Sequence, residues 1–497
     1  MNFTGLLFVL IGHFLSGRGT LAIFNIKLKP LITFLLSMIL GVALLSLVPF
    51  IMQLFYIPIT HTNVILGVAV LCLLLNIPTL IKLKNGNITM PKLNFNLQLY
   101  EIPVLLIFTI VMLVSIWRCF YYPPFARDML SGPEAIAEFT VREKTMINSI
   151  FSLNLESTNN HLKPPYATDL QIIYKMLVSP FGQVWLSVLA VSFLIWAYAI
   201  LREKLHPFIA GIIFLFFFTM PDPFAYTYIM LFDYSNMVFF FAGFYFLIQY
   251  LEKKQYNLFL FSVLLFGIAT YIRLETLVLE ALILPLLFFY FRKDKVPPVK
   301  MLIRFAIFLI VPFFFYEIWM GVFIKHYIPV HFNVDQELNK NFSNLSPFFE
   351  RLGSMTKILI FGISDNPGQK DINLRLYGYF IYLFMLILIV DIIFYRKYFT
   401  LESKVALYGI LVVYLGLPLL GYLIPWVDLM NTTKRGLYKM FPLMLLYMRN
   451  SGLLQMLSNN IRNWELPQIP GAKQPKTAMA NAGQPKPAAQ PNKKNKK

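Results

Sequence analysis

The chain has 497 residues, of which 58% are hydrophobic and only 13% are charged. Apolar runs such as 31–55 and 238–248 contain no charged residue, which excludes a soluble globular protein and indicates a polytopic helical membrane protein. The net charge of +19 does not require nucleic acid as a partner, because basic residues collect in alternate loops and seven lysines follow Trp464. That distribution is typical of the cytoplasmic side of a membrane protein.

Hydropathy along the chain predicts an all-α fold with 13 transmembrane helices. The first apolar run has no Lys or Arg before it and no small-residue cleavage site, so we expect a retained helix and not a signal peptide. The first and last runs are short, which leaves 11 or 12 helices as alternatives. The predicted spans are 3–17, 30–57, 63–81, 100–121, 183–201, 205–220, 226–250, 256–272, 274–291, 301–324, 376–395, 404–424 and 436–450.

Lys and Arg in the connecting loops predict the orientation of these spans. The loops that carry them have the same parity along the chain, and they lie at 18–29, 82–92, 202–204, 253–254, 292–295 and 396–397. We therefore expect the N-terminus outside, the lysine-rich tail in the cytoplasm, and a location in the plasma or inner membrane.

Six segments follow from this topology. Two connections on the predicted outer side are long, and loops of this length are usually functional or disordered. The tail is rich in Pro, Ala, Gln, Asn and Lys, which predicts disorder. The segments are N-terminal transmembrane helices at 1–121, a first external loop at 122–182, a central transmembrane bundle at 183–324, a second external loop at 325–375, C-terminal transmembrane helices at 376–457, and the tail at 458–497.

The first external loop begins with FARDMLSGPEAIAEFT at 125–140. Ser131 and Glu134 fit a capping box, and Pro133 suits the first turn of a helix. Apolar residues then recur at helical spacing, namely Ile136, Phe139, Met146, Ile147 and Ile150. We therefore predict an amphipathic helix that lies along the outer membrane surface.

Three carboxylates in this loop are candidates for chemistry. Asp128 follows a predicted span by a few residues with Arg127 beside it, and a carboxylate held near the membrane surface can serve as a base; a solvated loop acid is the alternative. Glu134 and Glu138 are four residues apart, so they share a helix face and, with Asp128, have the spacing to surround a cation or a phosphate-bound metal. A helix N-terminal acid that favours the dipole explains Glu134 equally well.

Two further motifs carry polar residues next to apolar segments. HLKPPY begins at His161, and its two prolines fix an extended segment that suits a loop descending into a membrane cavity; plain loop punctuation is the alternative. YIRLE places Arg273 and Glu275 near the outer end of a predicted span, where ionisable groups indicate a functional site unless they form an external cap. Other acids within apolar stretches are Asp233, Glu280 and Glu317.

Basic residues lie in two other predicted external loops. Lys325, His326 and His331 open the second long loop, and Lys434 and Arg435 lie in the last external loop. Cations that converge on the outer face can hold a phosphate. Each of them is also consistent with a solvated loop charge.

The order of these motifs resembles that of the GT-C superfamily of integral-membrane glycosyltransferases, in particular the protein mannosyltransferases and aminoarabinose transferases. The resemblance covers 118–290 and rests on PFARD, HLKPPY with a later FG, FDYSN and IRLE. One feature departs from the family pattern. There the acidic loop follows the first helix, whereas here it follows the fourth, so three extra N-terminal spans are needed.

The resemblance implies a sugar donor on a polyprenyl phosphate and a lipid, glycan or protein acceptor on the external face, with membrane lipids around the protein and no nucleic acid. It implies that Asp128 is the general base of an inverting displacement and that Arg273 stabilises the departing phosphate. The other residues expected to bind substrate are Arg127, Glu134, Glu138, His161, Glu275, Lys325, His326, Lys434 and Arg435. A divalent metal ion is the one cofactor left open, with Asp128, Glu134 and Glu138 as candidate ligands.

Two other classes of protein remain as alternatives. A transporter or lipid flippase would use intramembrane acids and arginines as a substrate or proton path, but the long external loops and the lack of an internal repeat count against it. A surface-glycan polymerase or ligase shares the topology and would depend on arginines and on a histidine of the second loop, such as His326 or His331.

Overall fold

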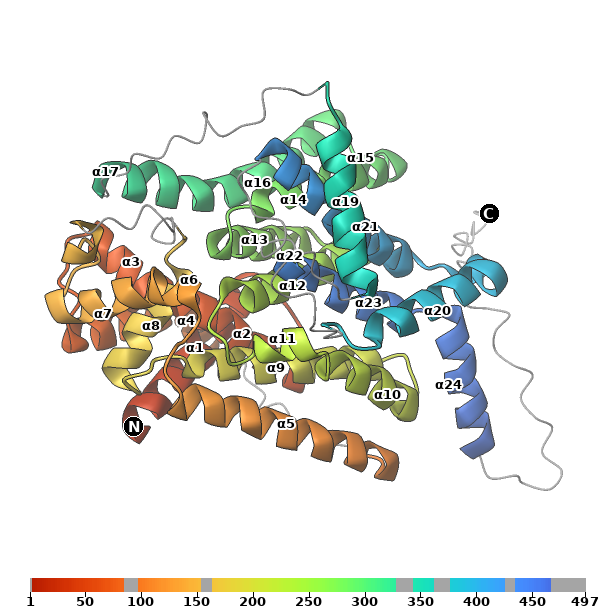
Figure 1. Cartoon of the computed structure of the whole chain (residues 1–497), viewed down its shortest axis with the longest axis horizontal. Coiled ribbons are helices and arrows are strands. Elements are labelled where there is room, and N and C mark those ends of the chain that lie inside the picture. Colours follow the sequence, from red (N-terminus) through yellow and green to blue (C-terminus); the bar gives the residue numbers. More distant parts are fainter. Residues whose placement is uncertain are drawn as a thin grey trace, which may run out of the picture.

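The structure, a computed structural model, describes residues 2–84, 97–152, 163–327, 343–361, 376–424 and 434–465. Every regular element within these ranges is a helix (Figure 1), which confirms the predicted all-α fold. His161, His331 and 466–497 of the predicted tail lie outside the described residues, as does the side chain of Arg127.

Eight of the described helices are long and apolar enough to cross a membrane. Three more apolar helices are shorter: α10 (Pro207–Phe218), α13 (Tyr256–Ile272) and α20 (Phe380–Phe394). The eight are α1 (Phe3–Ile23), α2 with α3 (Pro30–Leu45 and Leu47–Leu54), α4 (His61–Lys84), η1 with α5 (Leu99–Glu101 and Ile102–Tyr121), α9 (Val184–Arg202), α12 (Phe232–Lys253), α16 with η4 and α17 (Pro298–Glu317, Ile318–Ile324 and Lys325–Tyr327), and α21 (Leu401–Leu423).

The predicted count of 13 is not confirmed, because several apolar runs do not form long helices. The run at 274–291 is divided into α14 (Thr276–Ala281) and α15 (Leu284–Lys293), and Pro285 lies in the first turn of the second, where proline is well tolerated. The run at 436–450 becomes η7 (Leu437–Lys439) and the short α23 (Met440–Arg449). The other elements are α6 (Arg127–Leu130), α7 (Pro133–Glu143), η2 (Ser149–Ser152), α8 (Tyr166–Leu177), α11 (Pro221–Ala225), α19 (Ser346–Phe361), η5 (Arg396–Tyr398), α22 (Lys434–Gly436) and α24 (Gly452–Glu465).

The first two helices pack through glycines. A Cβ atom added at Gly17 of α1 would lie 1.9 Å from the backbone oxygen of Ser37, and one added at Gly41 of α2 would lie 1.9 Å from that of His13. Side chains therefore cannot occupy these two positions without separating the helices. Small residues that let backbones approach are a common way to pack transmembrane helices.

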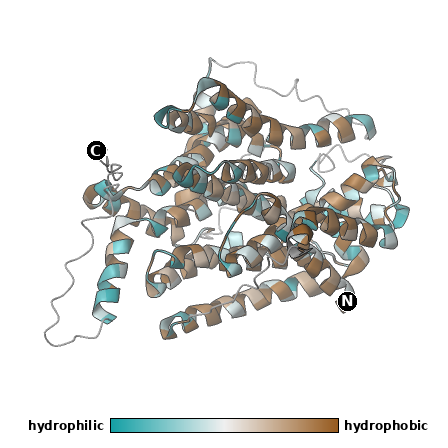
Figure 2. Cartoon of the chain, turned by 180° about the vertical axis from the view of Figure 1, so that it is seen from behind, coloured by the Kyte–Doolittle hydropathy of each residue, from teal (hydrophilic) through white to brown (hydrophobic). Residues whose placement is uncertain are grey.

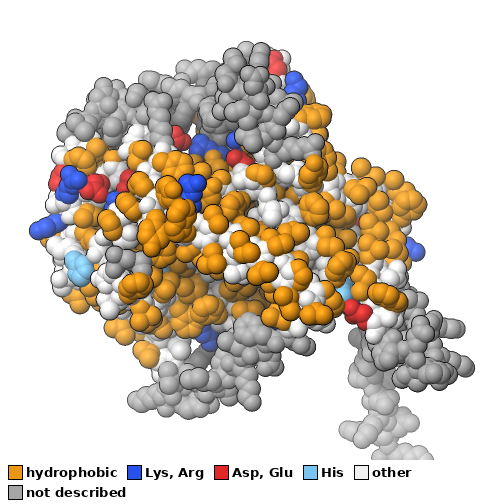
Figure 3. Space-filling model, turned by 60° about the horizontal axis from the view of Figure 1, so that its bottom comes forward, with side chains coloured by type: hydrophobic (Ala, Val, Ile, Leu, Met, Phe, Trp, Pro, Cys, Tyr) orange, Lys and Arg blue, Asp and Glu red, His pale blue; other side chains and the backbone are white. Residues whose placement is uncertain are grey.

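Burial differs strongly between the central and peripheral helices. The hydrophobic window of α12 is 94% buried, whereas that of α4 is 17% buried and that of α5 is 22% buried. Figure 2 shows that the long helices are mainly hydrophobic along their length, and Figure 3 shows hydrophobic side chains over most of one face. An apolar exterior of this extent fits contact with membrane lipids.

Charged side chains gather at the ends of the bundle. At the C-terminal end of α9, Arg449 pairs with Glu402 at 3.0 Å and with Glu203 at 2.9 Å. Lys29 pairs with Glu203 at 3.1 Å, and Lys204 pairs with Glu402 at 2.6 Å. These five residues form what we call the tail-end network. Lys29 and Lys204 come from two loops predicted to share one side, and they meet here.

Arg18 does not lie in the first basic loop as predicted. It lies inside α1, which runs to Ile23. The other end of α9 is its N-terminus at Val184, which comes directly after the first predicted external loop. This loop and the tail-end network therefore lie at opposite ends of the helix. Which end faces outward stays a prediction.

Candidate functional site

Asp128 lies on α6, and α7 begins three residues after α6 ends. The predicted capping box is wrong: the N-cap of α7 is Gly132, which has no side chain to accept a hydrogen bond. The expectation for Pro133 is confirmed, since it opens the first turn. The helix ends at Glu143 because Lys144 adopts a left-handed backbone with φ of 63°. The apolar residues predicted to lie on one helix are therefore divided between α7 and the segment that follows it.

Glu134 and Glu138 are bound by one lysine of α8. Lys175 Nζ lies 2.6 Å from Glu134 Oε1 and 3.1 Å from Glu138 Oε2. Gln171 Nε2 donates to the second oxygen of Glu134 at 2.6 Å, and Arg142 pairs with the second oxygen of Glu138 at 2.8 Å. All four carboxylate oxygens are therefore engaged by protein groups.

The PFG turn at 180–182 completes this arrangement. Gln171 Nε2 also donates to the carbonyl of Phe181 at 3.0 Å, and Lys175 donates to that of Pro180 at 3.0 Å. Gly182 has φ of 73°, and a Cβ there would lie 3.0 Å from both side chains, so a side chain at this position would strain the backbone and crowd the two partners. We call Glu134, Glu138, Gln171 and Lys175 the α7–α8 clamp.

The clamp shifts the titration of its two acids in opposite directions. Burial raises the pKa of Glu134, although hydrogen bonds and charge from Lys175 and Gln171 oppose the rise. Burial acts in the same sense on Glu138, but Lys175 and Arg142 outweigh it and the pKa of Glu138 is lowered. Within the described ranges no group of three or more His, Cys, Asp or Glu side chains could hold a metal ion. The contacts give both acids a structural role, and the metal remains an untested prediction.

Asp128 faces two cations from distant parts of the chain. Arg435 of α22 lies 3.4 Å from Asp128 Oδ2, and Lys163, which precedes α8, lies 3.6 Å from the same oxygen. The Asp128 side chain is 40% exposed, compared with 14% for Arg435. The carboxylate is therefore ion-paired but open to solvent.

Asp233 lies behind this group at the start of α12. Its side chain is 2% exposed and pairs with Arg273, which also binds Glu275 with Nε and Oε1 2.5 Å apart. Arg435 reaches Asp233 at 3.8 Å as well as Asp128, so it connects the buried acid to the open one. We call Asp128, Lys163, Asp233, Arg273, Glu275 and Arg435, with Asp222 and Lys434, the charged cluster.

Asp222 is a further carboxylate, at the edge of the charged cluster. It lies on α11, pairs with Lys434 at 3.4 Å and accepts a hydrogen bond from Tyr438. Burial raises its pKa, and the charge of Lys434 opposes the rise. Tyr377 donates to the carbonyl of Lys434 at 2.8 Å, which fixes the backbone of α22.

The two cations beside Asp128, Lys163 and Arg435, have pKa values shifted in opposite directions. Burial lowers the pKa of Lys163 to about 8, although Asp128 opposes the change, and the ammonium group lies 5.8 Å from the centre of the Phe232 ring. Burial alone would lower the pKa of Arg435, but Asp233 and Asp128 outweigh it and raise that pKa. Arg435 therefore stays charged, whereas Lys163 can lose its proton at mildly alkaline pH.

The structure brings together five of the residues predicted from the sequence. They are Asp128, Arg273, Glu275, Lys434 and Arg435. Lys325 and His326 are exposed on α17, at the free end of the helix that begins with α16 (Figure 1), and no ion pair joins them to the charged cluster among the residues described. Lys163 and Asp222 were not identified as site residues from the sequence, although Lys163 is the lysine of the HLKPPY motif.

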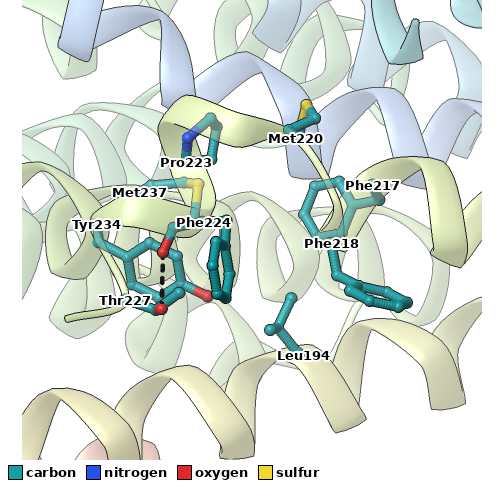
Figure 4. Close-up of a pocket in the computed structure, with 9 residues that line it drawn as sticks. All are labelled: Leu194, Phe217, Phe218, Met220, Pro223, Phe224, Thr227, Tyr234 and Met237. Carbon is teal, nitrogen blue, oxygen red and sulfur yellow. Dashed lines mark hydrogen bonds between the residues drawn. The ribbon is translucent and has the colours of Figure 1, made fainter. Parts of the chain in front are cut away.

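An apolar pocket lies among α9, α10, α11 and α12 (Figure 4). It is narrow, with a volume of about 10 Å³ that holds about one water molecule, and Thr227 in its wall donates to the carbonyl of Phe224 at 2.7 Å. Pro223 in the wall directly follows Asp222 of the charged cluster, so one short helix contributes to both. The lining residues are Leu194, Phe217, Phe218, Met220, Pro223, Phe224, Thr227, Tyr234 and Met237.

Comparison of the chain with models of protein families, with curated proteins and with solved structures finds no match. The resemblance to GT-C enzymes expected from the order of the motifs therefore stays a prediction. The charged cluster is the observation from which function is inferred below.

Proposed function

We propose that the protein is a membrane glycosyltransferase that moves a sugar from a polyprenyl-phosphate donor to an acceptor on the external face, with inversion and with Asp128 as general base. The observation that carries the proposal is the open carboxylate of Asp128 between Lys163 and Arg435. In the proposed displacement a hydroxyl loses a proton while a phosphate leaves. A base can accept that proton, and two cations beside it can stabilise the charge of the departing phosphate.

The loose contacts of Asp128 support an exchange of partners. Both of its ion pairs are longer than 3.3 Å, beyond the usual 2.7–2.9 Å of charge-assisted hydrogen bonds. A donor phosphate would attract Lys163 and Arg435 more strongly than one carboxylate does. Asp128 would then be free to accept the proton of the attacking hydroxyl.

The displacement balances with these groups alone. The acceptor oxygen forms a bond to the anomeric carbon while the bond from that carbon to the phosphate oxygen breaks. The phosphate keeps the electron pair beside Lys163 and Arg435, and the hydroxyl proton passes to Asp128. Lys434, which pairs with Asp222 at 3.4 Å, would add a third cation at the edge of the site.

Arg273 takes a different part from the one first expected. Its guanidinium already binds Asp233 and Glu275, so it is a positioning residue that holds Asp233 against Arg435. The lipid-facing helices supply surfaces for the hydrocarbon part of a lipid donor.

The test is transfer of a sugar from a polyprenyl-phosphate donor by the protein in lipid vesicles. Asp128→Asn should lower the rate by about 10² to 10⁴, the usual contribution of a positioned base, and should leave the unfolding temperature unchanged. Asp294→Asn is the matched control, because Asp294 is a partly exposed, ion-paired acid on α15's C-terminal side. Full activity of Asp128→Asn would contradict the proposal.

A transporter is the second candidate, because an acid of a predicted span lies inside the bundle without a cation in the described part of the chain. Glu280 accepts a hydrogen bond from Thr270 at 3.1 Å and is fully buried. Such groups mark proton or ion paths in transporters. Substrate-driven proton uptake that is lost in Glu280→Gln but kept in Asp128→Asn would favour this function over sugar transfer.

A further inference from the structure

Glu280 is a buried acid next to an interruption in an apolar run. The predicted span at 274–291 is divided into α14, which ends at Ala281, and α15, which begins at Leu284, so Glu280 lies in the last turn of the first half. Its side chain is fully buried, as are those of its apolar neighbours Leu279 and Ile283. Discontinuous helices of this kind hold ion and substrate sites in membrane proteins.

The contacts of Glu280 include no positive charge. Both of its oxygens accept from the hydroxyl of Thr270 at 3.1 Å, and no ion pair joins it to a cation in the described part of the chain. A hydroxyl has one hydrogen, so the two oxygens share a single donor. An ionised carboxylate is costly in an apolar interior unless an opposite charge balances it. Glu280 therefore needs either a proton or a bound cation.

Asn236 of α12 brings further oxygen atoms to the same place. Its Nδ2 donates to the carbonyl of Ala269 at 2.7 Å and to the hydroxyl of Thr276 at 2.9 Å, which uses both hydrogens of the amide. Its Oδ1 is buried and has no hydrogen-bond partner among the residues described. Ala269 precedes Thr270 in the chain, and Thr276 and Glu280 are four residues apart on one face of α14. The unpartnered amide oxygen and the unbalanced carboxylate therefore belong to one buried polar group.

We propose that this group is a site for one monovalent cation such as sodium, formed by Asn236, Thr270, Thr276 and Glu280. The side chains offer a carboxylate, an amide oxygen and two hydroxyls, and hard cations prefer oxygen ligands of this kind. One carboxylate balances one positive charge. A divalent ion would keep half of its charge unbalanced in an apolar interior, which is unfavourable.

The proposed site lies close to the charged cluster. Asp233 and Asn236 are three residues apart on α12, about one helical turn, and Arg273 directly follows the end of α13. A cation held by α12, α13 and α14 would join these three helices beneath the pair of Asp233 and Arg273. The ion therefore stabilises the frame of the charged cluster. This inference does not depend on the sugar-transfer reaction.

Equilibrium binding of radioactive sodium to the full chain in detergent, at mildly alkaline pH, tests the site. We expect one ion per chain, displaced by unlabelled sodium and not by choline. Glu280→Gln keeps the shape of the side chain but removes its charge. It should lower the affinity by more than about 100-fold, since loss of a group that only supports a metal ligand already costs about 10- to 100-fold.

Two variants of Thr270 separate the loss of a ligand from damage to the fold. Thr270→Val keeps the shape without the hydroxyl and should weaken binding at least about tenfold, whereas Thr270→Ser keeps the hydroxyl and should bind as the wild type does. Asp169→Asn removes another fully buried acid and should leave sodium binding unchanged. The unfolding temperature in sodium-free buffer shows that each variant is folded.

Three results would overturn the proposal. They are a wild type that binds no sodium, a folded Glu280→Gln protein that binds sodium as tightly as the wild type, and displacement of the label by calcium at concentrations far below those at which sodium displaces it.

Discussion

Asp128 and Asp233 show how burial assigns different roles to the same side chain. Asp233 is 2% exposed and pairs with Arg273, and Arg435 also lies near it; a buried carboxylate of this kind needs its partners in order to exist as an anion. Asp128 is 40% exposed and its ion pairs are long. Only Asp128 can exchange partners at low cost, which is why we assign the base to it.

The charge of Lys163 makes the proposed reaction dependent on pH. Its pKa in the folded protein is about 8, below the ordinary value of 10.5, so it is charged below about pH 8 and neutral above. We expect kcat/KM for the lipid donor to fall as pH rises through this value, because the neutral amine no longer attracts the phosphate. Lys163→Arg should abolish the fall, since arginine stays charged; an unchanged profile in that variant would rule out Lys163 as its source.

Asp169 makes stability dependent on pH. Burial raises its pKa well above the ordinary value of 3.8, so the folded protein keeps a proton that the unfolded chain has already lost. Stability is therefore full below pH 3.8 and decreases as pH rises toward the folded pKa, by up to about 1.4 kcal/mol per pH unit.

The variant Asp169→Asn removes this titration but keeps a group that can accept from Tyr271. Its unfolding temperature should exceed that of the wild type at neutral pH, and the difference should shrink at acidic pH. Thermal unfolding in detergent at the two pH values checks this. Parallel pH dependence of the two proteins would show that Asp169 does not carry the proton.

At the scale of elements, the α7–α8 clamp is the feature that fixes the first external loop. Lys175→Met would leave Glu134 and Glu138 without their shared cation in a largely buried contact, which costs about 3 kcal/mol. Hydrogen exchange of α7 should show a corresponding loss of protection. Arg142→Gln is the control, because this arginine is 68% exposed and such surface pairs contribute at most about 1 kcal/mol. Equal effects of the two variants would contradict the clamp.

Local patterns predicted the existence of this loop's helix but not its limits or its partners. Pro133 marked its start correctly, since the reason is local. The carbonyl of Lys144, where the helix ends, accepts from the backbone N–H of Ile59, and the two acids contact Gln171 and Lys175 of α8. These partners lie more than 20 residues away, and no spacing within the loop encodes them. For the same reason Glu134 and Glu138 looked like substrate ligands, and Lys163 was overlooked.

At the scale of the whole molecule, hydropathy identified apolar segments reliably and their lengths poorly. The runs at 183–201 and 404–424 match α9 and α21 closely. The runs at 205–220 and 274–291 became short or divided helices, because proline and packing set helix ends where hydrophobicity alone does not change. The charged cluster draws residues from 128 to 435, so its assembly follows from the tertiary fold and not from any local motif.

The orientation of the bundle is predicted by the basic loops and can be tested with single cysteines. Cys72 and Cys119 are buried and should not react with a maleimide that cannot cross membranes. In intact cells Arg142→Cys should be labelled, and Lys397→Cys should be labelled only after the membrane is opened. The reverse pattern would place Asp128 in the cytoplasm and exclude an external reaction.

The most direct test of the central claim is an experimental structure of the protein in lipid with a polyprenyl phosphate bound. We predict that the phosphate lies within hydrogen-bond distance of Lys163 and Arg435, that these cations have moved away from Asp128, and that the isoprene chain lies along the lipid-facing helices. A phosphate bound beside Lys325 and His326, with the charged cluster unchanged, would contradict the account.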